Sequence, residues 1–128
     1  LKSGIGRLSA YCGAVCAATG AGCAMTYLDG GTLEQIDQTI TNSIATSSGM
    51  VCDGAKPSCA AKIATSLESA IMAHDLAMAN RAFQSGEGIV MDNVEQTIYA
   101  VGCVASQGMH ITDQVILNLM TQQKGVRA

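Results

Sequence analysis

The sequence predicts an all-α protein, a compact bundle of about five helices around a buried central helix rich in Gly and Ala. Apolar residues recur at intervals of three and four along most of the chain, which is the spacing of one helix face. Residues that start and stop helices divide the chain into segments of helical length, and no useful stretch alternates as a strand does. Its 128 residues, 48% of them hydrophobic, fit a single domain spanning 1–128.

The first predicted helix lies within residues 8–28, which carry no charge between Arg7 and Asp29. The length suits a membrane span, but the segment is rich in Gly, Ala, Ser, Thr and Cys and poor in Leu and Ile. We therefore expect a helix buried on all sides of a bundle, with no membrane contact. Gly30 and Gly31 should end it.

The second predicted helix begins at Thr32, a favourable N-cap, with Glu34 in its first turn. Residues 46–49, Thr-Ser-Ser-Gly, should end it. A third helix should start at Pro57, whose missing N–H has no intrahelical partner in a first turn, and run to about Ala79. The apolar residues at helical spacing in the second helix are Leu33, Ile36, Ile40 and Ile44.

Residues 80–91 favour a loop or a short hairpin around Gly86 and Gly88. Asp92 is the expected N-cap of a fourth helix, with Glu95 as its capping-box partner. This helix should end near Gly108, and a last helix should begin at His110 or Thr112.

Composition excludes one class of partner. The net charge is −3 and no run of Lys or Arg occurs, which argues against a nucleic-acid-binding surface. The chain begins at Leu1 rather than at a methionine, and we interpret it as part of a longer protein.

Charge, sulfur and an irregular backbone coincide in residues 49–59, Gly-Met-Val-Cys-Asp-Gly-Ala-Lys-Pro-Ser-Cys. Six residues separate Cys52 from Cys59, which is not a common zinc spacing. A third thiol, from Cys12 or Cys16, is available on the first helix, where the two lie four apart on one face. Three thiolates without a fourth protein ligand suit an iron–sulfur cluster with one open iron, able to polarise a leaving group.

A second interpretation stays open for these cysteines. Cysteine is among the most buried residue types, so the thiols would only pack in a core or bind zinc in a non-enzymatic helical domain. We expect Cys23 and Cys103 to be core residues in either case. His74, on a face of Ala and Met, is expected in the core or at its rim.

Asp53 and Lys56 are the candidate catalytic residues, and each has a simpler alternative. Asp53 is equally suited to capping a turn. Lys56 would act as a base if burial and cationic neighbours lowered its pKa, would hold a substrate carboxylate if it stayed charged, and would otherwise be a solvated loop residue.

Several segments are recognisable in order: residues 4–13 (Gly-Ile-Gly-Arg-Leu-Ser-Ala-Tyr-Cys-Gly), 27–31 (Tyr-Leu-Asp-Gly-Gly), the cysteine loop continued to Ala60, 87–89 (Glu-Gly-Ile) and 108–113 (Gly-Met-His-Ile-Thr-Asp). With these segments the chain resembles the iron–sulfur-dependent L-serine dehydratase α-chain family, and most closely its L-cysteine desulfidase-like branch. The resemblance covers essentially the whole chain.

The resemblance implies an all-helical catalytic portion that holds a [4Fe–4S] cluster on Cys12, Cys52 and Cys59. It implies a lyase that carries out β-elimination on a small amino acid, L-serine or L-cysteine, without pyridoxal phosphate. The products would be pyruvate and ammonia, with sulfide from cysteine. It also implies a cytoplasmic enzyme whose N-terminal portion completes the substrate site, this chain being the C-terminal fragment, and it leaves a homo-oligomer open.

Overall fold

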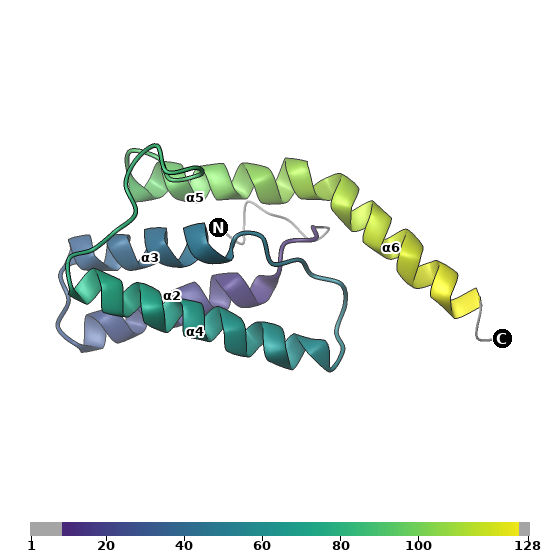
Figure 1. The fold of residues 1–128 in the computed structure, drawn as a ribbon, viewed down its shortest axis with the longest axis horizontal. Coiled ribbons are helices and arrows are strands. Elements are labelled where there is room, and N and C mark those ends of the chain that lie inside the picture. The colour runs from purple at the N-terminus through teal and green to yellow at the C-terminus, as the bar shows by residue number, and fades with distance from the viewer. Residues whose placement is uncertain (1–8, 126–128) are drawn as a thin grey trace.

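The computed structural model describes residues 9–125, and this part of the chain is helical apart from short connections (Figure 1). Its elements in order are α2 (Gly13–Leu28), α3 (Leu33–Ser47), α4 (Ser58–Met78), α5 (Val94–Cys103), the π-helical turn η1 (Val104–Gly108) and α6 (Met109–Gly125). Extended backbone within these residues amounts to one isolated antiparallel bridge between Tyr11 and Val51. The all-α prediction is confirmed.

The helices α2, α3 and α4 pack on one another, and α5 packs on α3 (Figure 1). Because α3 returns the chain, α2 and α4 run parallel and both begin at the same end of the molecule. The helix α6 continues from η1 and leads away from the three packed helices. No helix within residues 9–125 combines the length and apolar character needed to cross a bilayer.

The Gly- and Ala-rich helix α2 is buried along one face rather than on all sides. Its buried face comprises Val15, Ala18, Thr19, Gly22 and Thr26. Ala17, Gly20, Ala21 and Ala24 are exposed on the other side. A run of small uncharged residues permits burial but does not demand it, since exposing alanine costs little. The most enclosed position falls to α3, which contacts α2, α4 and α5.

Local signals set the helix ends where the structure agrees with the sequence. Thr32 caps α3 by accepting a hydrogen bond from the Gln35 N–H (3.2 Å), and the Gln35 side chain accepts one from the Thr32 N–H (2.9 Å). This reciprocal pair satisfies two N–H groups that the first helical turn leaves free. Pro57 directly precedes α4, and Asn80 reverses the chain after it with φ +55°.

Two boundaries differ from the prediction. Asn93, not Asp92, caps α5 by accepting a hydrogen bond from the Gln96 N–H (2.9 Å). The predicted break near Gly108 is absent, because η1 joins α5 directly to α6. In a π-turn the backbone hydrogen bonds shift by one residue. The Ser9 hydroxyl donates to the carbonyl of Ala105 in this turn (2.7 Å).

The apolar core lies where the start of α2 meets the end of α3 and the segment from α5 to α6. It consists of Ala10, Tyr11, Cys12, Val15, Ile44, Val101, Ala105 and Met109. Between α2, α3 and α4 the interior is instead small and polar. Thr26 Oγ1 lies 2.8 Å from Thr39 Oγ1 and 3.0 Å from Nδ1 of His74, and these residues are buried. His74 is thus a core histidine, as expected.

Small residues allow these three helices to approach closely. A Cβ atom added at Gly22 of α2 would lie 3.1 Å from the Ala70 carbonyl oxygen of α4 and 3.3 Å from Thr39 Cγ2 of α3. Gly20, two residues earlier in the same helix, has no heavy atom within 4 Å of such a Cβ. Substitution of Gly22 therefore tests the packing between helices, whereas substitution of Gly20 tests helix propensity alone.

Gly22→Ala should destabilise the fold by about 1–3 kcal/mol, because the added methyl group forces two helices apart. Gly20→Ala is the matched control and should stabilise by about 0.5–1 kcal/mol, since alanine loses less backbone entropy in a helix. Urea unfolding followed by circular dichroism measures both changes. Equal effects of the two substitutions would contradict the close packing at Gly22.

Candidate functional site

The two segments that carry Cys12 and Cys52 are joined by backbone pairing. The Cys12 N–H donates to the carbonyl of Met50 (3.0 Å), and the Cys52 N–H donates to that of Ala10 (2.5 Å). These hydrogen bonds flank the bridge between Tyr11 and Val51. Two cysteines separated in sequence by the whole of α2 and α3 are thereby held on neighbouring extended segments.

A groove of about 570 Å³ opens beside this bridge, between the first halves of α2 and α4. All three cysteines that the resemblance implies line it: Cys12, Cys52 and Cys59. Cys12 is buried, Cys59 half-buried and Cys52 exposed. The other residues that line the groove are Gly13, Ala14, Ala17, Ala18, Ala21, Gly54, Ala55, Lys62, Ile63 and Leu67. The groove therefore offers thiols and one cation in an otherwise apolar wall.

Two helices begin at this groove. Cys12 is the N-cap of α2, and Cys59 lies in the first turn of α4. The N-terminus of a helix carries a partial positive charge, which favours negative charge nearby. Because α2 and α4 both begin at one end of the molecule (Figure 1), both positive ends lie at the same groove, which Gly13 and Cys59 line. The site is therefore electrostatically suited to thiolate sulfur or to another anion.

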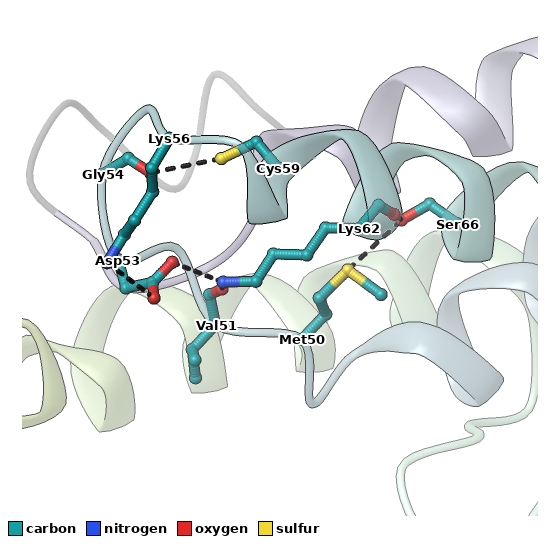
Figure 2. A network of polar contacts seen from close by, with 8 residues as sticks. All are labelled: Met50, Val51, Asp53, Gly54, Lys56, Cys59, Lys62 and Ser66. Atoms are coloured by element: carbon teal, nitrogen blue, oxygen red, sulfur yellow. Dashed lines mark hydrogen bonds and ion pairs between the residues drawn. The ribbon is translucent and has the colours of Figure 1, made fainter.

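The cysteine loop is fastened to α4 by a lysine that the sequence did not single out (Figure 2). Lys62 Nζ donates to the carbonyl of Val51 (2.9 Å) and pairs with Oδ1 of Asp53. Lys56 Nζ lies 3.1 Å from the other carboxylate oxygen of Asp53. Asp53 therefore bridges a loop lysine and a helix lysine.

The two lysines also change the acidity of Asp53. Hydrogen bonds from Lys62 and then Lys56 lower the pKa of its carboxyl from 3.8 to about 2. The same contact with Asp53 raises the pKa of Lys62 above its ordinary value. Both groups are therefore charged at neutral pH, and the ion pair is present throughout the physiological range.

The remaining cysteines lie elsewhere. Cys16 and Cys23 line a different groove, between α2, α3 and α5. Cys12 and Cys16 do not share a helix face, contrary to the prediction, because α2 begins only at Gly13. Cys103 is half-buried near Tyr99 on α5 and does not belong to the core cluster. Of the two possible third thiols, Cys12 is the one in the groove with Cys52 and Cys59.

The three thiols share a groove but are not arranged as a finished metal centre. Within residues 9–125 no three His, Cys, Asp or Glu side chains are close enough together to hold a metal ion. The Cys59 thiol instead donates to the carbonyl of Gly54 (3.1 Å) in the same loop. The donor set of three thiols in an apolar groove fits an iron–sulfur cluster chemically. Binding one requires the loop 52–59 to adjust.

Lys62 is the site residue that sequence reasoning missed. The available signal was its position three residues after Cys59, which places both side chains on one side of α4. Its partners, Val51 and Asp53, precede the helix and reach Lys62 only because the loop folds back on the first turns of α4.

Comparison with known proteins identifies the family. The family model described as "Serine dehydratase alpha chain" matches residues 1–118. This chain belongs to the serine dehydratase alpha chain family. The match includes the segment 4–8 used for the resemblance, which lies outside the residues that the structure describes. No solved structure gives a significant match.

Proteins named "UPF0597 protein" are similar to this chain. The protein from Treponema denticola is 56% identical over 119 residues, which are 93% of this chain and 28% of that protein. The one from Lachnoclostridium phytofermentans has the same identity and coverage. "UPF0597 protein BF3560" from Bacteroides fragilis is 46% identical over 96% of this chain and 29% of its own length. The chain thus spans under a third of these relatives.

The Asp53 ion pairs predict a pH dependence of folding in the metal-free chain. A carboxyl whose pKa falls from 3.8 to about 2 on folding stabilises the fold above pH 3.8, and this contribution disappears as the pH falls through 2. Asp53→Asn should therefore be less stable than the wild type at pH 6, and the difference should shrink as the pH falls from 3.8 through 2. Urea unfolding across this pH range measures the difference, and a difference that does not depend on pH would contradict the ion pairing.

Proposed function

We propose that this chain is the cluster-binding part of a [4Fe–4S]-dependent lyase that carries out β-elimination on L-serine or L-cysteine. The products are pyruvate and ammonia, with sulfide when cysteine is the substrate. The observation that carries the proposal is the shared groove: Cys12, Cys52 and Cys59, from three separate segments, line one apolar cavity at the start of two parallel helices. Membership of the serine dehydratase alpha chain family supports it.

In this proposal Cys12, Cys52 and Cys59 are the cluster ligands. A cluster bound through three cysteines supplies a Lewis-acidic iron that polarises the leaving hydroxyl or thiol of the substrate. The helix N-termini of α2 and α4 face the same space and favour the negative charge of thiolates and of a substrate carboxylate. The small side chains of α2, Ala14, Ala17 and Ala21, leave room for a small amino acid.

The candidate proton-transfer residues are Lys56 and Asp53. Elimination needs a base that takes the α-proton, after which the β-substituent leaves with a proton and the aminoacrylate hydrolyses to pyruvate and ammonia. Asp53, whose pKa is about 2, is a weak base at neutral pH. Lys56 is more exposed than Lys62, and its side chain pairs with Asp53. It lies outside the lining of the groove, so it would meet a substrate there only when the cysteine loop adjusts.

The proposal includes the rest of a longer polypeptide, because the chain spans under a third of its relatives. That N-terminal portion would complete the substrate site, and a homo-oligomer stays compatible with it. The proposal places the protein in the cytoplasm, where reducing conditions keep cysteines from forming disulfides and leave thiols available to bind a cluster.

The full-length protein, reconstituted anaerobically with iron and sulfide, should release pyruvate from L-serine or L-cysteine. Cys52→Ser should reduce the rate to that of an assay without enzyme, because one cluster ligand is lost. Cys23→Ser is the matched control and should retain activity, because Cys23 lies on α2 but lines a different groove. Pyruvate is measured with a coupled dehydrogenase.

Iron content separates the outcomes. Cys12→Ser should lose iron while Cys16→Ser keeps it, since only Cys12 lies in the groove with Cys52 and Cys59. Full-length protein that holds tightly bound zinc, or no metal under anaerobic conditions, would instead support a non-enzymatic helical domain with structural or zinc-binding cysteines. Pyruvate release that survives Cys52→Ser would also overturn the proposal.

A further inference from the structure

We propose that Lys62 is a positioning residue that sets the placement of Cys52 relative to Cys59; this inference rests on the proposed role of the three cysteines as ligands. Lys62 contacts the residues on both sides of Cys52: the Val51 carbonyl accepts from its Nζ (2.9 Å), and the Asp53 carboxylate pairs with it. It projects from α4 one turn after Cys59. One side chain therefore ties the backbone around one cysteine to the helix that carries the other.

A second contact on α4 supports the same segment. The hydroxyl of Ser66, one turn further along the helix, donates to Met50 Sδ (3.3 Å) and to the carbonyl of Lys62 (2.8 Å). Met50 in turn accepts the Cys12 N–H. Residues 50–53 therefore lie along α4 and are held by Lys62 and Ser66, as Figure 2 shows.

Two sets of contacts set the relative positions of the three cysteines. One set relates Cys12 to Cys52, and the other relates Cys52 to Cys59. Backbone pairing with Met50 and Ala10 fixes Cys12 beside Cys52 and does not depend on side chains. The contacts that hold residues 50–53 against α4 are made by side chains, and of these Lys62 contacts residues on both sides of Cys52. The segment 54–57 consists of bends and a turn, with Gly54 at φ +91°, and its last two residues accept backbone hydrogen bonds from the first turn of α4. Lys62 therefore controls the placement of Cys52 relative to Cys59.

Lys56 provides a matched comparison. Its side chain pairs with the same carboxylate, through the other oxygen (3.1 Å), but the residue belongs to the loop, and its contact with α4 is a backbone hydrogen bond from the Cys59 N–H to its carbonyl (2.8 Å). Its side chain is 41% exposed, against 22% for Lys62. An exposed ion pair within one loop contributes little, whereas residues that orient ligands typically change affinity by about tenfold to hundredfold when removed.

Sodium arsenite is a suitable probe, because As(III) binds convergent thiols and needs neither iron nor substrate. Reduced, metal-free, full-length protein is titrated with arsenite under anaerobic conditions and followed by sulfur-to-arsenic absorbance. Wild type should bind one equivalent, and Cys52→Ser should bind more weakly. Lys62→Met should bind about tenfold to hundredfold more weakly, while Lys56→Met stays close to wild type. Lys62→Arg keeps a cation that reaches both partners and should restore affinity.

Circular dichroism separates positioning from folding. Lys62→Met should keep the helical signal of the wild type while losing arsenite affinity. If it does not fold, Asp53→Asn replaces it, since this variant removes the ion pair and leaves the Val51 carbonyl in place; it should also bind more weakly than wild type. The inference would be overturned if Lys62→Met, or Asp53→Asn in its place, bound arsenite as tightly as wild type. It would also be overturned if Lys56→Met lost as much arsenite affinity as Lys62→Met.

Iron reconstitution of the same variants distinguishes this inference from the proposed function. If wild type and Lys62→Met hold equal iron and bind arsenite equally, the positioning role fails and the cluster assignment stands. If wild type binds arsenite through the three cysteines, Lys62→Met does not, and neither holds iron, the cluster assignment fails and Lys62 still positions the thiols.

Discussion

The close parallel packing of α2 and α4 is the constraint on which the site depends. It requires residues without bulk where the helices cross, and Gly22 against Ala70 meets that requirement. Because α3 brings the chain back between them, the two helices start at one end of the molecule. Cys12, Cys59 and two positive helix ends therefore share one groove. A longer connection or a bulkier contact face would separate them.

The interior next to this crossing is unusual in being polar. Thr26 of α2 is hydrogen-bonded to Thr39 of α3 and to His74 of α4. Asp29 Oδ2 lies 3.2 Å from Nε2 of His74. Thr19 and Ser43 form a second link, 2.8 Å long. Such hydrogen bonds add little net stability but are costly when broken, so they favour one alignment of the helices over a shifted one. Small side chains alone interlock too weakly to specify one alignment of the helices. In this core the buried hydrogen bonds supply that specificity.

The sequence predicted the helix boundaries that depend on residues close together in the chain. The cap at Thr32 and the start of α4 at Pro57 follow from local chemistry, and both appear. The choice of Asn93 over Asp92 was not predictable, because both side chains cap helices well and the packing of Thr97 decides the register: its hydroxyl accepts from the Met91 N–H (3.1 Å). Lys62 escaped notice for a similar reason, since its partners lie across a loop whose path the sequence does not state.

One hydrogen bond joins the beginning of the described chain to a point near its end. The Ser9 hydroxyl donates to the carbonyl of Ala105, 96 residues later, and also accepts the N–H of Tyr11. During synthesis the strand that leads into Cys12 is made long before η1, the turn that anchors it, has left the ribosome. The helices α2, α3 and α4 can associate as they emerge, yet the first cysteine gains its final support only after almost all of these residues have been translated. The support that η1 gives to the segment before Cys12 is thus added only after α2, α3 and α4 have been made.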